Sequence, residues 1–222
     1  MQVSPFLRFN RRAPHGIPPA AASPTLGVLG GAFNPVTEGH LALARQAQES
    51  LLLDEVLFVL PEQLPHRQPE EASFADRLAM LEVALLPSPH FSLATSTHGL
   101  FLDIARALEP HYPPATRLFF LIGSDAAERI LRWDYPNQEA SLREMFSRLA
   151  LVVAGRAGKR GWPQDPQLAP FASCLHTLEM PLEYRHLSAS RVREACRQGQ
   201  TIEGLVPPAV AAYIREKKLY TQ

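Results

Sequence analysis

Short apolar runs alternate with helical patterns along most of this chain, and this alternation constrains its fold more than any other feature. The runs at 55–60 and 149–154 are apolar at consecutive rather than alternate positions, as expected for parallel strands covered by helices on both faces. Strands are predicted at 26–30, 55–60, 91–95, 117–122, 149–154 and near 174–179. The pattern predicts the α/β class: a single doubly wound (Rossmann-like), mostly parallel sheet flanked by helices, with ligands at the carboxyl ends of its strands.

Helical patterns fill the intervals between these runs. The clearest is an apolar stripe at helical spacing between Phe74 and Leu85. Helices are predicted at 39–52, 74–86, 100–109, 125–132 and 139–147. A small helical segment closes the chain, with one helix capped by Ser188 or Ser190 and another that begins at Pro207–Pro208. Long irregular segments are predicted at 61–73 and 155–173.

The length of 222 residues suits one α/β domain. Residues 1–24 contain arginines and several prolines but no acidic residue, and we expect them to form an irregular N-terminal arm. The domain then covers 25–222 and includes the closing helices at 188–218. A targeting peptide is the alternative interpretation of the arm, but its prolines interrupt an amphipathic helix and no apolar core follows its arginines.

Charge and cysteine content argue against several functions. Lys plus Arg equals Asp plus Glu at 22 each, so no strong net field favours nucleic acid or an anionic membrane. Cys174 and Cys196 have neither metal-ligand spacing nor a disulfide framework, which suits a reducing cytoplasm. No apolar run approaches the ~20 residues of a membrane span. We therefore expect a cytoplasmic protein without a metal site of its own, without nucleic-acid or membrane partners, and with homo-oligomerisation left open.

The segment Gly30–His40 has the features of a phosphate-binding turn. It follows the apolar run at 26–29 and opens a helical pattern. Gly30 and Gly31 allow a sharp turn and a close approach of the backbone to a ligand. The N–H groups and positive dipole end of the next helix favour an anion there, with His40 at the rim. The segment has neither the Lys-Ser/Thr ending of a P-loop nor the glycine spacing of a dinucleotide fingerprint.

Two segments carry a resemblance to a known superfamily. Gly30–His40 (GGAFNPVTEGH) resembles the G-G-T-F-[DN]-P-[IV]-[HT]-x-G-H signature of the HIGH-type nucleotidyltransferases, with Ala32 at the usual Thr or Ser and Thr37 at the first His. Leu187–Arg193 (LSASRVR) is similar to the segment I-S-[SA]-T-x-[IV]-R, which surrounds the ATP triphosphate in that superfamily. The pattern that follows, ending at Leu219–Tyr220, resembles that of nicotinate-nucleotide adenylyltransferases in particular.

The resemblance implies that ATP, with Mg²⁺, donates an adenylyl group to nicotinate mononucleotide, giving deamido-NAD and pyrophosphate in NAD biosynthesis. It implies catalytic roles for His40, which would donate a hydrogen bond to the α-phosphoryl oxygens, and for Thr37 beside it. The ATP-binding residues that it implies are Gly30, Gly31, Ala32, Phe33, Gly39, His40, Gly123, Asp125, Arg156, Ser188, Ser190 and Arg193. The implied acceptor-binding residues are His66, Arg67, Asp103 and Trp133.

Shorter segments carry several of these assignments. Ile122–Asp125 resembles the family's I-G-x-D near adenosine, and Leu131–Trp133 resembles [PL]-[KR]-W, whose Trp stacks on the pyridine ring. Pro61–Arg67 resembles P-x-x-x-P-P-H-[KR], one residue shorter, which would meet the mononucleotide phosphate, and Val153–Gly158 resembles V-x-R-P-G. Arg77 fits R-x-x-M-L and is expected to support the loop. Without the resemblance, these residues also suit a helix cap, a core tryptophan and solvated loops.

The segment expected to recognise the nicotinate ring is the least typical. The family pattern S-Y-T-x-D-T-L falls on Gly99–Ala105, where only Asp103 matches, so the polar Tyr and Thr side chains are missing. Two alternatives therefore stay open. One is a different phosphorylated acceptor, such as nicotinamide mononucleotide, phosphopantetheine or a cytidylyl-type substrate. The other is an ATP-binding paralogue without catalytic activity.

Overall fold

The sheet of this protein is mostly parallel and has one antiparallel edge. The computed structural model describes residues 6–63, 72–123, 137–155 and 166–221. Within these residues, seven strands are arranged in the order β1-β4-β3-β2-β5-β6-β7. They are β1 (Leu7–Arg11), β2 (Thr25–Gly30), β3 (Glu55–Pro61), β4 (Phe91–Ser96), β5 (Arg117–Gly123), β6 (Leu149–Gly155) and β7 (Leu175–Glu179). Only β1 runs antiparallel to its neighbour; the other described pairs are parallel.

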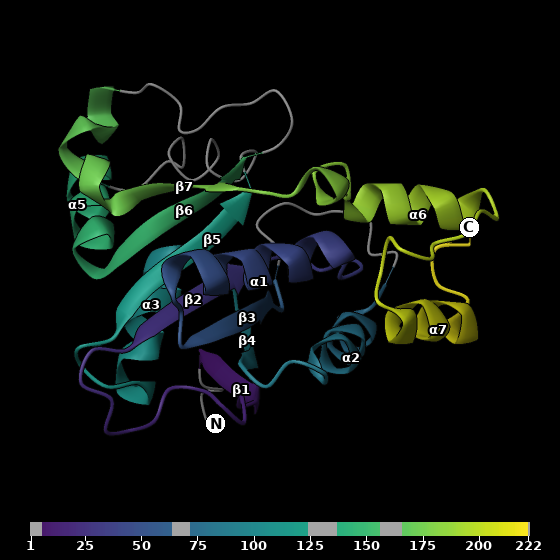
Figure 1. The fold of residues 1–222 in the computed structure, drawn as a ribbon, viewed down its shortest axis with the longest axis horizontal. Helices are drawn as coiled ribbons and strands as arrows, with labels where there is room; N and C mark the ends of the chain where they lie inside the picture. Colours follow the sequence, from purple (N-terminus) through teal and green to yellow (C-terminus); the bar gives the residue numbers. More distant parts are fainter. Residues whose placement is uncertain (1–5, 64–71, 124–136, 156–165, 222) are drawn as a thin grey trace.

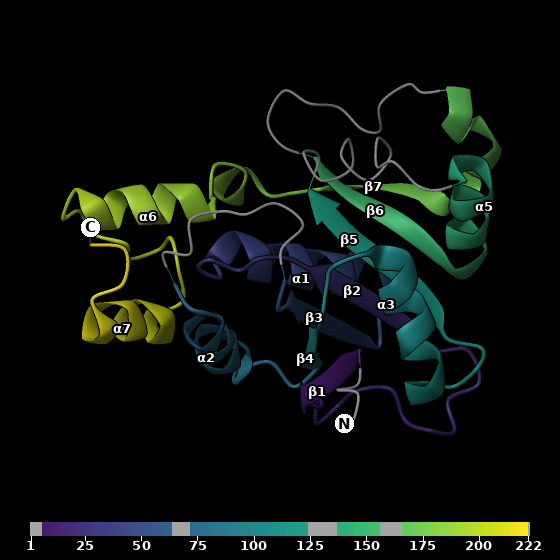
Figure 2. The same cartoon turned by 180° about the vertical axis from the view of Figure 1, so that it is seen from behind.

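Helices cover both faces of the sheet (Figures 1 and 2). The described helices are α1 (Glu38–Leu51), α2 (Phe74–Leu85), α3 (Phe101–Leu108), α5 (Gln138–Arg148), α6 (Ala189–Arg197) and α7 (Pro208–Lys217), with short 3₁₀ helices η1 (Glu109–His111), η2 (Pro166–Cys174) and η3 (Leu182–Tyr184). Helices α1 and α2 share one apolar cluster with the sheet, and α3 and α5 share the other. Helices α6 and α7 lie beyond the carboxyl ends of the strands (Figure 1). The predicted doubly wound architecture with a small C-terminal helical segment is confirmed.

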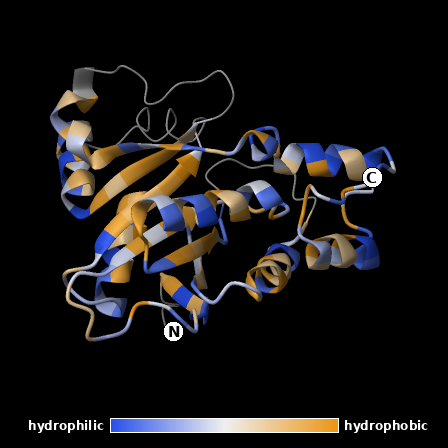
Figure 3. Ribbon diagram, in the orientation of Figure 1, coloured by the Kyte–Doolittle hydropathy of each residue, from blue (hydrophilic) through white to orange (hydrophobic). Residues whose placement is uncertain are grey.

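Burial on both faces explains the uninterrupted apolar runs. In β3, Phe58 and Leu60 belong to the cluster beneath α1 and α2, whereas Leu57 and Val59 belong to the cluster beneath α3. Successive side chains of a strand point to opposite faces, so each position of such a strand meets a helical layer. The central strands are accordingly hydrophobic along their length (Figure 3).

The strand order places a topological switch point between β2 and β5. The chain runs from β2 outward through β3 and β4, and then returns to β5 on the other side of β2 before continuing to β6 and β7. Ligands of open α/β sheets bind at the carboxyl ends of strands at such a reversal. Gly30 ends β2 and Gly123 ends β5, so these two of the predicted ATP-binding glycines lie at this edge.

The predicted irregular conformation of the N-terminal arm is wrong for Leu7–Arg11. This segment forms β1, with Leu7 paired to Ser96 and Arg8 paired to Thr95 of β4. Apolar and polar residues alternate along it, and the side chain of Leu7 is buried whereas Arg8 is exposed. This is the pattern of an edge strand covered on one face, and its shortness concealed it beside the prolines.

The other predicted elements differ from the structure at their boundaries or lie outside it. The strand near 174–179 is β7, and the helix at 100–109 is α3, which is one residue shorter at each end. The segment 155–173 is predicted to be irregular, and this is wrong for residues 166–173, which belong to η2. The predicted helix at 125–132 lies outside the described residues. Within the described ranges, no helix combines the length and the apolar character that crossing a membrane requires.

Candidate active site

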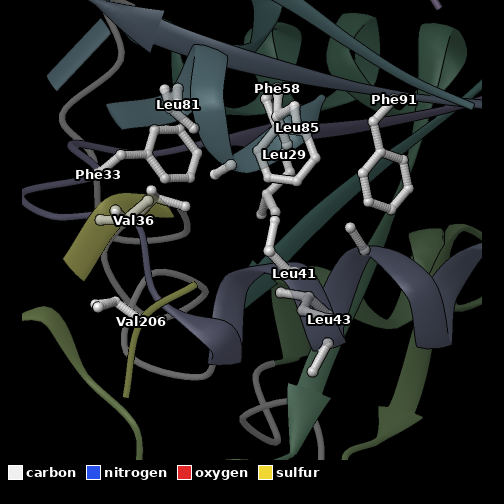
Figure 4. Close-up of a cluster of buried hydrophobic side chains, with 14 of the residues drawn as sticks. Leu29, Phe33, Val36, Leu41, Leu43, Phe58, Leu81, Leu85, Phe91 and Val206 are labelled. Carbon is white, nitrogen blue, oxygen red and sulfur yellow. The ribbon is translucent and has the colours of Figure 1, made fainter. Parts of the chain in front are cut away.

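The glycine turn comprises residues 30–37, between β2 and α1. The buried ring of Phe33 fixes this turn to the hydrophobic core. This ring is 2% exposed and lies 5.8 Å from the ring of Phe58, in the cluster that also contains Leu81 (Figure 4). The backbone of Phe33 is left-handed, with φ of 45°. Residues with a side chain adopt this conformation only where the surroundings enforce it. Burial of the ring provides that enforcement, which leaves only the backbone of Phe33 to meet a ligand.

Hydrogen bonds fix the remaining backbone of the glycine turn. The amide of Gly31 donates to the carbonyl oxygen of Val59 at 3.3 Å. The buried guanidinium of Arg77 donates from Nη1 to the carbonyl oxygen of Ala32 at 3.0 Å. Among the described residues, no acceptor is bonded to the amides of Ala32 or Phe33. In the described part of the chain these two amides are thus not engaged, and Arg77 supports the turn; most of the loop that Arg77 was expected to support lies outside the described residues.

His40 is oriented by the residue that caps its own helix. Thr37 is the N-cap of α1, and its amide N–H donates to Nδ1 of His40 at 3.0 Å. The hydroxyl oxygen of Thr37 lies 2.8 Å from the same nitrogen. An amide can only donate, so Nδ1 is the acceptor and a neutral imidazole carries its proton on Nε2. The ring of Phe33 meets the imidazole edge-on at 5.2 Å, which completes its orientation.

The N-terminus of α6 is bonded directly to the glycine turn. Ser188 caps α6, and its hydroxyl oxygen accepts from the amide of Arg191 at 3.2 Å. Arg193 donates from Nη1 to the carbonyl oxygen of Asn34 at 2.9 Å and from Nη2 to the hydroxyl of Ser190 at 3.3 Å. Arg193 and Asn34 are 159 positions apart in the sequence. Two predicted ATP-binding segments therefore meet in space.

The two helix N-termini, of α1 and α6, approach each other closely. A Cβ atom on Gly39 would lie 3.2 Å from Cβ of Leu187, so a side chain at this position would require Leu187 to give way slightly. The amide of Glu38 donates to the carbonyl oxygen of Leu205 at 3.0 Å, which ties α1 to the segment before α7. The positive ends of two helix dipoles thus lie beside the same turn, together with the guanidinium of Arg193. This arrangement favours an anion that carries several negative charges.

Two residues that sequence reasoning did not assign to the site brace the turn. Asn34 is 6% exposed, and its side-chain oxygen accepts from the hydroxyl of Tyr220 at 2.7 Å. Tyr220 lies near the end of the chain and is 4% exposed. Asn34 therefore receives Tyr220 on its side chain and Arg193 on its carbonyl. The only sequence signal was the presence of both residues in the family-like patterns.

The segment from Thr97 to Asp103, which the sequence predicts to lie on the acceptor side of the site, leads into α3. The ring of Phe101 packs on that of Phe120 at 4.8 Å, and its edge lies 3.9 Å from where a Cβ on Gly30 would be. In the first turn of α3, Asp103 lies 3.4 Å from Nη1 of Arg106 and 3.7 Å from Nε2 of His98. The start of α3 is therefore adjacent to the glycine turn.

The remaining predicted site residues divide into two groups. A Cβ on Gly123 would meet no heavy atom within 4 Å, so the end of β5 faces open space in the described structure. Five residues lie outside the described ranges: His66, Arg67, Asp125, Trp133 and Arg156. In the ranges that are described, no three His, Cys, Asp or Glu residues are grouped so that they could hold a metal ion.

Comparison with known proteins identifies the class first. Residues 28–195 match the cytidylyltransferase-like family, a span that runs from β2 through the glycine turn to α6. The chain belongs to this class of nucleotidyltransferases. Three relatives, each named "Probable nicotinate-nucleotide adenylyltransferase", narrow the assignment. Those from Dehalococcoides mccartyi and Bordetella pertussis are both 33% identical and cover 87% and 88% of this chain and 96% and 97% of their own lengths. The third, from Geobacter sulfurreducens, is 32% identical over 87% of this chain and 97% of its own.

The particular family follows from that identity and coverage: the chain belongs to the nicotinate-nucleotide adenylyltransferases, as its motifs indicated. A solved structure agrees in fold. The Plasmodium falciparum nicotinic acid mononucleotide adenylyltransferase in complex with NaAD has a TM-score of 0.69 at 18% identity, covering 89% of this chain and 97% of its own. A second structure of that enzyme, in complex with APC, has a TM-score of 0.67 at 17% identity with the same coverage.

Proposed function

We propose that this protein transfers the adenylyl group of ATP to nicotinate mononucleotide and releases deamido-NAD and pyrophosphate. The observation that carries the proposal is the contact of α6 with the glycine turn before α1, made by Arg193 and Asn34. One helix end suits one phosphate, whereas two adjacent ends suit a polyphosphate. The names of the relatives supply the acceptor.

The reaction needs no covalent enzyme intermediate. A phosphate oxygen of the acceptor attacks the α-phosphorus of ATP in line, and the bond from that phosphorus to the bridging oxygen of the β-phosphate breaks, so pyrophosphate carries away the electron pair. The residues therefore act by position and charge. His40 donates from Nε2 to an α-phosphoryl oxygen, because Thr37 occupies Nδ1.

The remaining contacts to ATP are assigned along the same edge of the sheet. The amides of Ala32 and Phe33, with the glycines of the turn, hold the phosphates next to α1. Arg193, Ser188 and Ser190 hold the β- and γ-phosphates at α6. Mg²⁺ comes with ATP as part of the substrate, held by phosphates and water.

The N-terminus of α3 supports an acceptor that carries a carboxylate. Leu100, its N-cap, makes no side-chain capping hydrogen bond, so backbone amides of the first turn are available to an anion. The ring of Phe101, in this first turn, lies 3.9 Å from where a Cβ on Gly30 would be, next to the ATP side. Backbone donors of this kind favour the charged nicotinate ring over the neutral nicotinamide ring, and they compensate for the missing Tyr and Thr. Asp103 with His66, Arg67 and Trp133 completes the acceptor set that the family resemblance implies.

The cellular setting is part of the same proposal. We place the protein in the cytoplasm, with ATP and a mononucleotide as its partners and with neither nucleic acid nor membrane required. Homo-oligomerisation stays a prediction, which sedimentation of the purified chain would test.

A panel of acceptors tests the function directly. Purified protein is mixed with ATP and Mg²⁺ and with nicotinate mononucleotide, nicotinamide mononucleotide or phosphopantetheine, and pyrophosphate release is followed. We expect the highest kcat/KM with nicotinate mononucleotide. Preferential turnover of another acceptor would reassign the substrate, and ATP binding without any turnover would identify a non-catalytic paralogue.

A further inference from the structure

The N-terminal strand β1 lies outside the residues matched by the family, which begin at residue 28, yet it borders the acceptor side of the site. We infer that β1 is a positioning element for the acceptor: Phe6, immediately before the strand, holds the segment Thr97–Asp103 in the position from which it meets the mononucleotide. This inference rests on the proposed function and identifies a residue outside the family motifs on which acceptor affinity depends.

Contacts between β1 and this segment are direct. The amide of Thr97 donates to the carbonyl oxygen of Phe6 at 3.1 Å, one residue beyond the pairing of Leu7 with Ser96. The ring of Phe6 meets the imidazole of His98 edge-on, with centroids 4.8 Å apart and an interplanar angle of 65°. The pairing of β1 with β4 therefore extends past the end of β4 into the segment that leads to α3.

His98 transmits this contact to the start of α3. Its carbonyl oxygen accepts from the hydroxyl of Ser96 at 2.8 Å, and its Nε2 lies 3.7 Å from a carboxylate oxygen of Asp103. Its Nδ1 is buried and, in the described part of the chain, has no hydrogen-bond partner. Within the described residues the imidazole has one long ion-pair contact, to Asp103, and no hydrogen bond, so packing against Phe6 is needed to hold its orientation.

The opposite side of the segment is held by the sheet and the glycine turn. Leu7 is 5% exposed and belongs to the same apolar cluster as Ile104 of α3. Phe101 packs on Phe120 and lies beside Gly30. The first turn of α3 thus packs between β1 and the glycine turn. Leu100 and Phe101 occupy the positions of the family's polar Tyr and Thr, so external packing provides the order that polar side chains do not.

Strand β1 offers a matched control for the test. Phe9 of β1 is also a half-buried aromatic residue. Its ring, however, lies 5.1 Å from His111 and 6.1 Å from Tyr112, at the other end of α3. Phe6→Ala and Phe9→Ala remove rings of the same size, one immediately before β1 and one within it. Only the first removal reaches the acceptor segment.

Steady-state kinetics of the full-length protein distinguish the two variants. We expect Phe6→Ala to raise the KM for nicotinate mononucleotide about three- to tenfold, the factor typical of a lost aromatic pair, while the KM for ATP stays unchanged. Phe9→Ala should leave both KM values at their wild-type levels, and Phe6→Tyr should restore the wild-type acceptor KM. Thermal unfolding of each variant verifies that it is folded under the assay conditions.

Equal acceptor KM values for the two alanine variants would overturn the inference, as would a proportional rise in both KM values for Phe6→Ala. Either result leaves the proposed function intact, because wild-type turnover is measured in the same experiment. A wild-type protein that forms no deamido-NAD from ATP and nicotinate mononucleotide would instead contradict the proposed function, and the inference with it.

Discussion

At the glycine turn, polar contacts from distant parts of the chain converge on a few backbone atoms, whereas the segment 97–103 is held mainly by aromatic and apolar packing. Arg77, Arg193 and Tyr220 all donate to the turn, at Ala32 or Asn34. In contrast, Phe6 and Phe101 hold the acceptor side through their rings. The side proposed for the triphosphate thus has a hydrogen-bonded frame, while the side proposed for the acceptor is shaped by packing.

This difference has a consequence for substitutions. A donor that is fixed by hydrogen bonds presents its charge in one geometry, so its loss affects binding or turnover of ATP strongly. Apolar packing is adaptable in residue identity, so changes on the acceptor side shift affinity by smaller factors. The acceptor preference can therefore vary among chains that share the same ATP side.

The largest expected effect is that of His40→Ala. Loss of the only side-chain donor assigned to the α-phosphoryl oxygens should lower kcat by about 10²- to 10³-fold, while the fold persists. Single-turnover kinetics with ATP and nicotinate mononucleotide measure this. His90→Ala removes an imidazole just before β4, at the amino ends of the strands, and should retain wild-type turnover. Near-normal kcat in His40→Ala would remove the catalytic role of this residue.

Arg193→Ala should affect ATP binding next. Loss of charge-assisted hydrogen bonds at the β- and γ-phosphates, together with the bond to Asn34, should raise the KM for ATP about 10- to 100-fold. Arg193→Lys keeps the positive charge but not the planar guanidinium, so its KM for ATP should lie between those of the wild type and Arg193→Ala. Arg197→Ala, in the last turn of the same helix, is the control. If the KM for ATP of Arg193→Ala equalled that of the control, the glycine turn would not differ from segment 97–103 in its sensitivity to substitution.

Tyr220→Phe should have a smaller effect on the same substrate. The change removes the hydroxyl that binds the side chain of Asn34, and we expect the KM for ATP to rise about two- to fivefold because one buried hydrogen bond is lost. Tyr213→Phe removes the hydroxyl that donates to Asp76 at 3.0 Å and serves as the matched control. Steady-state kinetics with varied ATP separate the variants; equal KM values for ATP would show that Tyr220 does not brace the turn.

Tyr112→Phe should leave both KM values unchanged and affect stability alone. The hydroxyl of Tyr112 donates to the buried carboxylate of Glu55 at 2.7 Å, at the start of β3. Without this hydroxyl, Glu55 still accepts a hydrogen bond from the amide of Ile17. We expect a loss of about 1–3 kcal/mol in the free energy of unfolding. Urea denaturation measures this. A change in either KM would contradict the claim that contacts at the amino ends of the strands do not affect the site at their carboxyl ends.

The same pair predicts a response to alkali. Burial, and then the charge of Glu55, raise the pKa of Tyr112 above its ordinary value of 10.0. The folded state therefore holds this proton at pH values where the unfolded chain releases it. Its stabilising contribution is complete below the ordinary pKa and decreases as the pH rises above it. Tyr112→Phe should lose less stability than the wild type over that alkaline range.

The sequence predicted most of the architecture because its signals were local and repeated. Consecutive apolar positions in β3 and β6 matched strands buried on both faces. Strand β1 was missed because its alternating pattern is short and irregular, with a register shift between Phe9 and Arg11. Its position also depends on pairing with β4, which lies more than 80 residues later in the chain.

The site was predictable only as separate segments. The glycines indicated a turn before a helix, and Ser188 was one of two expected caps. The bonds from Arg193 and Tyr220 to Asn34 join positions 159 and 186 residues apart, which no local pattern encodes. Packing of Gly39 against Leu187 is of the same kind, because it depends on how two helices cross.

Product analysis tests the central claim most directly. Full-length protein is incubated with ATP, Mg²⁺ and nicotinate mononucleotide, and the products are quantified by mass spectrometry together with pyrophosphate. We predict deamido-NAD and pyrophosphate in equal amounts. Consumption of ATP without deamido-NAD, or bound ATP that is never consumed, would contradict the claim that the glycine turn and segment 97–103 form one adenylyl-transfer site.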